Sequence, residues 1–476
     1  MAAKIKQNFT EGGLFFKILL FALPILATSV LQILYNAADN IVVGQFSGDP
    51  EALAAVGCTG AVSNIMINLV IGVSSGAGVI VAQLYGAKRH EAVSRASHTA
   101  MLTSVIAGLL FMVIGLLVHR PLLSLMVEEE SILDKAASYL FVISLGIPAS
   151  SVYNFGSAIV RSIGDSKTPL IILIVSGLIN VLLNLLFVMV FHMAVVGVAL
   201  ATIISQYVSA LVISIILLRA KGESYGIEPK KLRLDTGLLV RMLAIGIPAG
   251  LQSSAYSISN MFITAGVNSF ERPIISANAI ASNIDNILYV AMVAFMQAAM
   301  TSTGQNFGKG DRKRVMKSLF YSSALSVIVG FIVATVIFVL KEPIITLYVD
   351  PNDPLANEVI AAAVRWVSFF VYPYMICGLF EVLSGFLRGL GNSTAPMIIV
   401  LTCACLFRIV WVSFIFPNLP HELESLLWCY PVSWTLSALS AVAVILFSVR
   451  KLNRMNLEVE NESPSADDAT EECPSH

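Results

Sequence analysis

Long apolar stretches alternate with short polar segments along almost the whole chain. Twelve of these stretches carry few charges and are long enough, at about 20 residues or more, for an α-helix to cross a bilayer. The predicted fold class is therefore an all-α integral membrane protein. Its twelve expected transmembrane helices lie over residues 14–36, 53–80, 96–118, 136–158, 168–191, 194–218, 238–264, 275–303, 318–340, 358–386, 395–416 and 425–449.

The two halves of the chain repeat each other. Pro24 in the first apolar stretch aligns with Pro248 in the seventh, and the segment RSIGDSKTP at 161–169 aligns with RGLGNSTAP at 388–396. The offset is 222 to 227 residues at every matched position. Because six spans separate the copies, both begin on the same side of the membrane. We therefore expect two homologous six-helix lobes related by a parallel pseudo-twofold axis along the membrane normal.

These patterns divide the chain into four parts. A first lobe over residues 1–218 is joined by a polar linker, 219–237, to a second lobe over 238–452. Residues 453–476 are acidic, contain Ser and Pro and have few aromatics, so we predict a disordered tail. The first apolar stretch is too long for a signal peptide, and we expect it to remain as a span.

Composition and charge agree with a membrane protein. Hydrophobic residues make up 57% of the chain and charged residues only 12%, with a mean hydropathy of +0.83. A net charge of −1 gives no reason to expect a nucleic-acid partner. With the N-terminus placed inside, 23 of the 29 Lys and Arg residues fall at inside positions. By the positive-inside rule, both termini are expected in the cytoplasm.

Polar residues interrupt the apolar spans of the first half at helical spacing. Gln32, Asn36 and Asp39 form one stripe late in the first span, and Asn180 and Asn184 share a face of the fifth. A buried carboxylate is costly in a membrane, and with amide oxygens it suits a hard cation or a proton. The alternative is a polar network that holds helices together.

A second stripe lies in the eighth span. It carries Asp285, Tyr289, Met292 and Met296 on one face. A carboxylate beside an aromatic ring and flexible thioethers suits a bulky apolar cation, so these residues are candidates for substrate binding. The alternative for the two methionines is ordinary packing against a neighbouring helix.

Two further charges fall at membrane depth. Glu381 lies in the tenth span and Arg408 in the eleventh, and neither has an obvious partner nearby in the sequence. We predict that Glu381 and Arg408 form an ion pair, which serves either coupling or a structural strut between the spans.

At this point the chain resembles the multidrug and toxic compound extrusion (MATE) family. The resemblance rests on the repeat and on NAADNIVVG (36–44), AQLYGAKR (82–89), RSIGDSKTP (161–169) and VGVALATIISQ (196–206), and it covers about residues 10–450. It implies two six-helix lobes that face each other in a V, with a drug exchanged for Na⁺ or H⁺.

The resemblance also implies site residues. The family's first-lobe cation site falls here on Asp39, Asn154, Asn180, Asn184 and Thr202. Many relatives carry an aspartate at the position of Asn184, so this chain departs from them and the choice between Na⁺ and H⁺ stays open. Asp285 and Glu381 resemble acids of bacterial members. The candidate substrate-binding residues are thus Gln32, Asn36, Asp285, Tyr289, Met292, Met296 and Glu381.

The expected function is secondary antiport that exports organic, often cationic and amphipathic, compounds. We expect no catalytic residue and no cofactor, since the coupling ion is the only ion required. The expected partners are small organic substrates and the lipid bilayer, and the protein is expected as a monomer in a bacterial inner membrane. A lipid-linked oligosaccharide flippase of the same superfamily and a membrane-embedded enzyme are the alternatives. An ATP-driven pump is disfavoured, because the sequence has no GxxxxGK[ST] motif.

Overall fold

The computed structural model describes residues 6–46, 51–124, 127, 129–351 and 353–462. These residues form helices and connecting turns, without a strand. The first half contains α1 (Leu14–Phe46), α2 (Ala52–Gly86), α3 (His90–Leu123), α4 (Glu130–Ser162), α5 (Lys167–Leu185) and α6 (Ala194–Arg219). The second half contains α7 (Thr236–Val267), α8 (Arg272–Lys309), α9 (Arg312–Thr346), α10 (Ala356–Phe370), α11 (Tyr374–Gly389), α12 (Thr394–Ile399), α13 (Phe407–Val410), α14 (Leu423–Leu427) and α15 (Cys429–Glu462).

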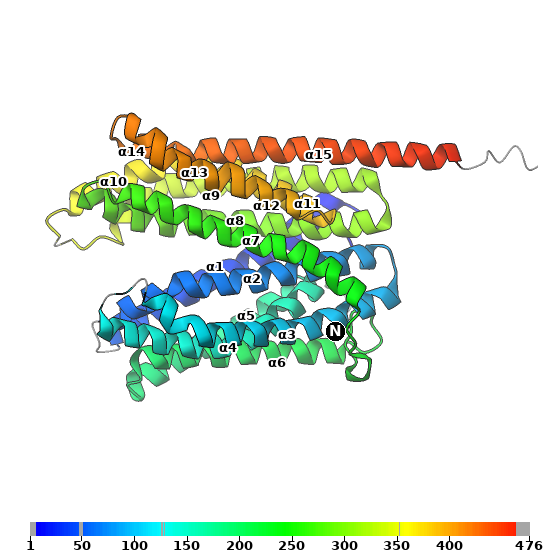
Figure 1. The fold of residues 1–476 in the computed structure, drawn as a ribbon, viewed down its shortest axis with the longest axis horizontal. Coiled ribbons are helices and arrows are strands. Elements are labelled where there is room, and N and C mark those ends of the chain that lie inside the picture. The colour runs from blue at the N-terminus through cyan, green and yellow to red at the C-terminus, as the bar shows by residue number, and fades with distance from the viewer. Residues whose placement is uncertain (1–5, 47–50, 125–126, 128, 352, 463–476) are drawn as a thin grey trace, which may run out of the picture.

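The helices form two bundles whose members run along a common direction (Figure 1). The described part of the chain has eleven spans long and apolar enough to cross a membrane, and a twelfth if the bent pair α10–α11 counts as one. The predicted fold class and its two six-helix lobes are confirmed. The predicted span 358–386 is not one straight helix, because it bends by 48° between α10 and α11. Pro373 sits in this break, where its missing N–H and the clash of its ring with the preceding turn prevent a continuous helix.

The connections between the lobes and at the C-terminal end are more ordered than the sequence suggests. The linker ends where α7 begins at Thr236. Asp235 is the N-cap of this helix, and its carboxylate accepts a hydrogen bond from the Leu238 N–H at 3.1 Å. Helix α15 continues to Glu462, so the first part of the predicted disordered tail, 453–462, is helical. The rest of that predicted tail, 463–476, lies outside the described residues.

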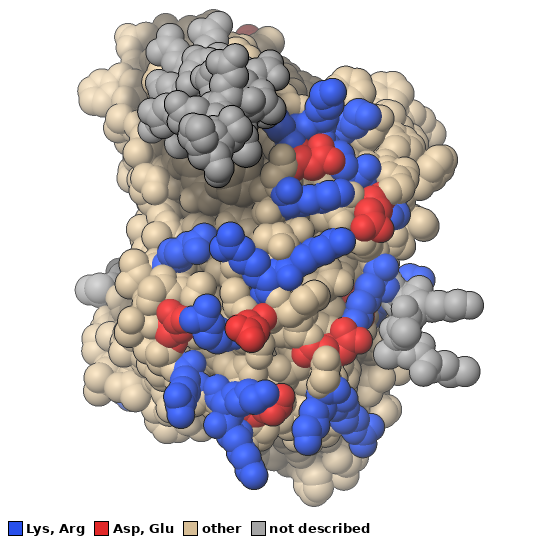
Figure 2. Space-filling model, turned by 90° about the vertical axis from the view of Figure 1, so that its right-hand side faces the viewer, with Lys and Arg blue, Asp and Glu red and all other residues tan. Residues whose placement is uncertain are grey.

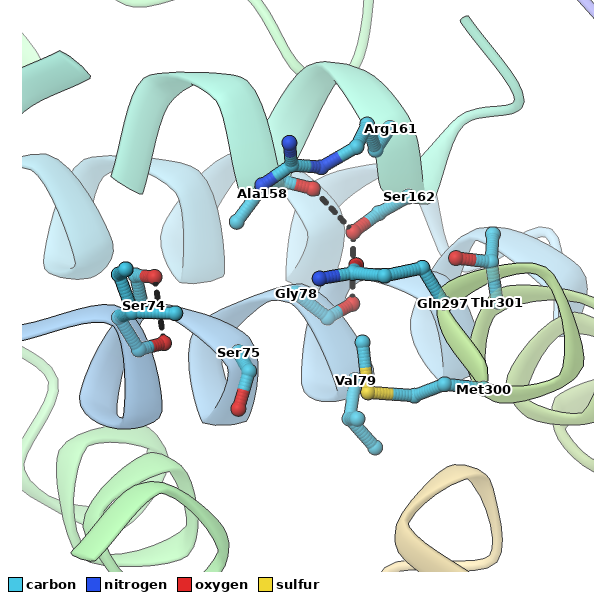
Figure 3. Close-up of a pocket in the computed structure, with 11 residues that line it drawn as sticks. Ser74, Ser75, Gly78, Val79, Ala158, Arg161, Ser162, Gln297, Met300 and Thr301 are labelled. Carbon is cyan, nitrogen blue, oxygen red and sulfur yellow. Dashed lines mark hydrogen bonds between the residues drawn. The ribbon is translucent and has the colours of Figure 1, made fainter. Parts of the chain in front are cut away.

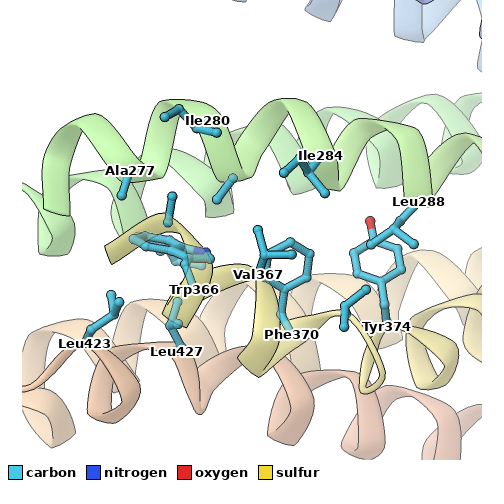
Figure 4. Close-up of a cluster of buried hydrophobic side chains, with 14 of the residues drawn as sticks. Ala277, Ile280, Ile284, Leu288, Trp366, Val367, Phe370, Tyr374, Leu423 and Leu427 are labelled. Atoms are coloured by element: carbon cyan, nitrogen blue, oxygen red, sulfur yellow. The ribbon is translucent and has the colours of Figure 1, made fainter. Parts of the chain in front are cut away.

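The second lobe has its apolar core between α8, α10 and α14 (Figure 4). Ile284 and Leu288 of α8 meet Trp366 and Phe370 of α10, and all four are almost fully buried. The bend at Pro373 turns α11 away from α10 and brings Tyr374 against the same core. The broken span therefore determines where the side chains of α11 can lie.

The lobes interlock through α1 and α7. Helix α7 begins against α2 of the first lobe, as Figure 1 also shows, and the first half of α1 packs against α8 and α9 of the second lobe. Helices α2 and α7 meet at two Gly-x-x-x-Gly pairs, Gly72 with Gly76 and Gly246 with Gly250. A Cβ at Gly72 would lie 2.3 Å from the Gly250 Cα, so only glycine permits this backbone contact. Small residues at such spacing are a common basis of helix association in membranes.

The two lobes are closed together at one end of the molecule. The Gln83 side chain of α2 donates to the Gly389 carbonyl of the second lobe at 2.9 Å, and Gln305 of α8 donates to the Ser162 carbonyl of the first lobe at 2.7 Å. These two bonds are equivalent under the internal repeat. We call the contact of the four helix ends, residues 83–86, 162, 305–308 and 389, the closed junction.

The segment before α1 crosses this closed junction. The Gln7 N–H donates to the Gly164 carbonyl of the first lobe at 2.9 Å, and the Phe9 N–H donates to the Gln305 side chain of the second lobe at 3.1 Å. Arg314 of α9 donates to the Phe9 carbonyl at 2.7 Å. The N-terminal segment thus ties both lobes together at this end.

The face beside the closed junction is rich in Lys and Arg (Figure 2). Exposed basic residues lie at helix ends, in turns and in the linker, on segments of both lobes: Lys88, Arg89, Arg95, Lys221, Lys230, Lys231, Arg233, Arg241, Lys309 and Lys313. This is the clustering that the positive-inside rule associates with a cytoplasmic face.

Candidate functional site

Four of the predicted cation-site residues meet in the first lobe. The Asn184 amide of α5 donates to the Asp39 carboxylate of α1 and, at 3.3 Å, to the Asn180 side-chain oxygen. Asn180 in turn donates to the Thr202 hydroxyl of α6 at 3.4 Å, and Thr202 also lies beside Asp39. Three helices therefore bring one carboxylate, two amides and one hydroxyl into a continuous cluster, which we call the Asp39 cluster.

One oxygen in the Asp39 cluster has no partner. Asn184 is completely buried, and its side-chain oxygen accepts no hydrogen bond from any described residue. A buried polar atom without a partner costs free energy of about 1–3 kcal/mol. A cation that binds between this oxygen and the Asp39 carboxylate would remove that cost. Tyr139 of α4, which the sequence reasoning missed, is close enough to interact with the Asp39 charge.

The remaining first-lobe candidates lie apart from the cluster. The Asn154 amide of α4 donates to the Ser150 carbonyl of its own helix at 2.8 Å, and within the described residues no hydrogen bond links it to Asp39. Gln32 and Asn36 are exposed on α1. Because polar groups are costly in lipid, exposed amides on an apolar span are expected to face aqueous space between the lobes. They stay candidates for substrate contact.

The backbone departs from α-helix beside the cluster and at the equivalent place in the second lobe. A π-helical turn, Leu186–Val190, directly follows Asn184 on α5. In the second lobe two π-helical segments, Val400–Leu406 and Trp411–Ile415, flank α13, which carries Arg408. Such widened turns are rare and occur often at functional sites.

A cavity of about 280 Å³ lies between the second lobe and α2. Asp285 of α8 is the one carboxylate among the residues that border it, and the Tyr374 hydroxyl lies beside that carboxylate. Asn68 of α2 supplies a wall from the first lobe. The other walls are largely aromatic or polar: Ser253, Tyr256, Ser257, Asn260, Asn286, Tyr289, Cys377, Arg408, Tyr430 and Trp434. Aromatic walls with convergent polar groups are common in small-molecule sites, although this cavity is more polar than most.

Arg408 forms one edge of this cavity, and it is not paired with Glu381. Its guanidinium donates to the Ser433 hydroxyl at 3.1 Å and to the Asn260 side-chain oxygen at 3.2 Å, and it lies 4.7 Å above the Tyr430 ring. The prediction of a Glu381–Arg408 ion pair is therefore wrong, since the described residues contain no such pair. The helix rotations turn Arg408 toward α7 and α15 instead of α11.

Comparison with known proteins identifies the family. The family model MatE matches the chain twice, over residues 24–186 and 248–413. Each match falls within one lobe, and together they cover more than half of the chain. The chain belongs to the MatE family. The resemblance to the MATE family in the sequence is thereby confirmed.

Relatives of this MatE protein carry names that point to drug export. It is 28% identical over 386 residues to the probable multidrug resistance protein YpnP of Bacillus subtilis, with 81% of this chain and 84% of that protein covered. It is 25% identical over 401 residues to the probable multidrug resistance protein YoeA of the same organism, with 83% and 85% covered. These names support a MATE-type efflux transporter.

Solved structures support the fold of this MatE protein. A MOP superfamily transporter from Pyrococcus furiosus superposes with a TM-score of 0.88, at 20% identity over 95% of this chain and 99% of that one. A MATE transporter in complex with MaL6 gives a TM-score of 0.87, at 19% identity over 96% and 100%. The two-lobe architecture of this MatE protein is therefore that of known transporters.

Three predicted substrate residues of this MatE protein lie in its core. Met292 packs closely against Gly330 and Gly378, and Met296 packs against Gly385 and the Arg388 guanidinium. Neither methionine borders the 280 Å³ cavity, so packing, the alternative interpretation, accounts for both. Glu381 does not border this cavity either, and its exposed fraction is 2%.

The cation that acts on Glu381 is Arg388, two turns along α11. The sequence placed Arg388 at the inside end of its span, but the structure buries it at 6% exposure, where it donates to Gln252 of α7 at 2.7 Å. The Glu381 Oε1 and the Arg388 Nε both lack a hydrogen-bond partner in the described part of the chain. Glu381 and Arg388 therefore compensate each other by charge without a direct bond.

We predict that Arg388→Met destabilises this MatE protein by about 3–5 kcal/mol, because it leaves the buried Glu381 charge uncompensated. The double variant Glu381→Gln with Arg388→Met is expected to be more stable than Arg388→Met alone. Thermal unfolding of the protein in detergent measures both. The matched control is Arg365→Met, which removes an exposed pair with Glu424 and should change stability by less than about 1 kcal/mol. A double variant no more stable than Arg388→Met would contradict the pairing.

Some cavity residues were missed although the repeat marked them. Tyr256 and Asn260 occupy the second-half positions of Gln32 and Asn36, at the offset of 224 residues that relates Pro24 to Pro248. Since the first pair was selected as candidate site residues, its equivalents could have been selected too. Tyr430 and Trp434, in contrast, lie in an apolar span without a signal that separates them from core aromatics.

Proposed function

We propose that this MatE protein is a secondary active antiporter that exports organic, often cationic and amphipathic, compounds in exchange for Na⁺ or H⁺. The observation that carries the proposal is the buried Asn184 side-chain oxygen, which accepts no hydrogen bond from the described residues and belongs to the amide that donates to the Asp39 carboxylate. Oxygen atoms of carboxylates, amides and hydroxyls are the ligands that hard cations prefer. Asn180 and Thr202 complete the set, and the same carboxylate can instead accept a proton.

The substrate is proposed to bind in the aromatic cavity of the second lobe. Asp285 supplies a negative charge, and Tyr289 supplies a ring face that attracts a cation, whereas the Tyr430 ring already holds the Arg408 guanidinium. Tyr256, Asn260 and Asn68 offer further polar contacts on the walls formed by α7 and α2. A bulky aromatic cation matches this combination of charge and shape.

Helix α1 is the proposed link between the two sites. Its first half, with Ile18, Phe21 and Ile25, lies in a core formed with α8 and α9 of the second lobe, while its second half carries Asp39. Pro24 lies within the first half, before the part of α1 that carries Asp39, and its ring blocks a regular helical hydrogen bond there. Cation binding at Asp39 would change the preferred bend of α1. The different affinities of the two lobe arrangements for cation and substrate then couple their opposite movements.

We predict that Asp285→Asn weakens export of a fluorescent aromatic monocation such as ethidium. Loss of one negative charge beside aromatic rings should weaken the binding free energy of the dye by about 1–2 kcal/mol. The half-saturating dye concentration should therefore rise roughly tenfold. Dye efflux from cells measures this effect. The matched control is Glu342→Gln, which removes an exposed acid on α9 and should leave export unchanged. An Asp285→Asn protein with unaltered half-saturation would contradict a dye site in this cavity.

The two alternatives from the sequence have less support. A lipid-linked oligosaccharide flippase needs cationic groups that face an aqueous cavity, whereas Arg408 already has two hydrogen-bond acceptors and a ring. A membrane-embedded enzyme needs a nucleophile or metal constellation, and the relatives are named as multidrug resistance proteins. We further propose that the protein acts as a monomer in the bacterial inner membrane, with the basic face of Figure 2 and both termini in the cytoplasm.

A further inference from the structure

A second polar cavity lies deep between the lobes, and the antiport mechanism does not use it. Helices α2 and α4 of the first lobe and α8 of the second border it (Figure 3). Arg161 is the one charged residue on its walls. The other polar walls are Ser74, Ser75, Ser162, Gln297 and Thr301.

The polar groups of this cavity are only partly satisfied within the protein. The Ser162 hydroxyl donates to the carbonyls of Gly78 and Ala158, as the dashed lines in Figure 3 show. Three other side chains have no such bond. Those of Arg161, Gln297 and Thr301 form no hydrogen bond or ion pair with another described residue. Arg161 is half-buried at the end of α4, next to the closed junction, and a guanidinium withdrawn from water without an acceptor is stabilised by an anion beside it.

The internal repeat shows why the charge of Arg161 is uncompensated. Its equivalent in the second lobe is Arg388, which has Gln252, Met296 and Glu381 around it. The first-lobe positions that match these three are Thr28, Ser74 and Asn154. Each is a smaller or neutral residue. The first lobe therefore keeps the cation, loses the acid and gains space beside the guanidinium.

We propose that the Arg161 cavity binds one small monovalent anion, of the size of chloride or formate. The space open to the centre of a water-sized particle in this cavity is about 20 Å³, which admits a small ion and is too small for a drug. Arg161 supplies the charge, and the Gln297 amide and the Thr301 hydroxyl supply donors from the opposite lobe. Donors to an anion from both lobes would stabilise the arrangement in which the lobes lie together.

The test is thermal unfolding of the purified full chain in detergent, at constant ionic strength and constant cation. Chloride or formate replaces gluconate, whose carboxylate is attached to a chain too bulky for the cavity. The unfolding temperature of the wild type should rise with the concentration of at least one of these two anions, chloride or formate, and reach a plateau. Arg161→Gln should raise the half-saturating anion concentration roughly tenfold to a hundredfold, the range for hydrogen bonds to a charged group.

The matched control is Arg89→Gln, which removes an exposed arginine from the same basic face and should leave the anion response unchanged. If Arg161→Gln does not fold, Gln297→Leu removes a donor from the other lobe and should weaken the same response. An unfolding temperature equal in chloride, formate and gluconate would overturn the proposal and indicate water alone in the cavity. So would an unchanged response in Arg161→Gln or in a folded Gln297→Leu. None of these readouts depends on transport, so they are independent of the proposed antiport.

Discussion

Asp39→Asn is expected to abolish cation-driven export while the protein stays folded in the membrane. The change keeps an oxygen that can accept the bond from Asn184, so stability should fall by no more than about 1 kcal/mol. It removes the one carboxylate of the Asp39 cluster. Four neutral ligands then remain, and they can neither bind a monovalent cation with charge compensation nor accept a proton near neutral pH.

The measurement is drug resistance of cells that produce Asp39→Asn, beside the amount of protein in their membranes. Resistance should drop to that of cells without the transporter. The matched control, Asp134→Asn, removes an exposed acid whose partner is Arg120 and should keep full resistance. Full resistance in cells with Asp39→Asn would exclude a coupling role for this carboxylate.

Gly86→Ala and Gly308→Ala are expected to open the closed junction. A Cβ at Gly86 would lie 1.9 Å from the Gln305 carbonyl oxygen, and one at Gly308 would lie 1.8 Å from the Gln83 carbonyl oxygen. Both clashes are with backbone of the opposite lobe, which cannot rotate away as a side chain can. Overpacking of this kind costs about 1–3 kcal/mol, so the closed population should fall roughly tenfold or more.

Distances between spin labels at Arg89 and Lys313, on a cysteine-free background, report the opening because these exposed residues lie on opposite lobes. Each variant should shift the distance distribution to longer values and lower export. The matched control is Gly57→Ala, the same substitution at a glycine with nothing within 4 Å of its added Cβ. Unchanged distances in both variants would show that the junction does not need glycine.

The symmetry of the fold is broken where the function is proposed. The equivalents of Asp39, Asn180 and Asn184 in the second lobe are Ile263, Phe407 and Trp411, none of which offers an acceptor for a cation. The second lobe instead holds Asp285 and Arg408 beside aromatic walls. This difference between two lobes built from one repeat fits the proposed exchange of a small cation for a bulky organic compound.

The spans could be predicted from sequence because bilayer thickness sets their length directly. Their ends could not, because helices continue past the hydrocarbon wherever the chain forms further contacts. Helix α2 extends to Gly86, beyond the predicted end at residue 80, since its last turn packs against Gln305. The break at Pro373 was missed because an internal proline bends some helices without interrupting them, as Pro24 and Pro148 lie inside unbroken α1 and α4.

The first-lobe site was more predictable than the second. Asp39 and Asn184 stand out as polar groups in apolar spans, and such groups tend to find one another. The partner of Glu381 was missed because pairing across helices depends on the rotation of each helix about its axis, which one sequence does not specify. A signal was nevertheless present, since Arg388 follows Glu381 by seven residues, a spacing that places both on one face of a helix.

The most direct test of coupling through Asp39 is substrate efflux from proteoliposomes, with a Na⁺ gradient and a H⁺ gradient imposed one at a time. Wild-type protein and Asp39→Asn are measured in parallel, with equal protein incorporated. The proposed mechanism predicts that at least one gradient drives wild-type efflux against a substrate gradient, and that neither drives it in Asp39→Asn. Gradient-driven efflux of equal rate in the two proteins, or uphill wild-type efflux after both gradients are collapsed, would contradict it.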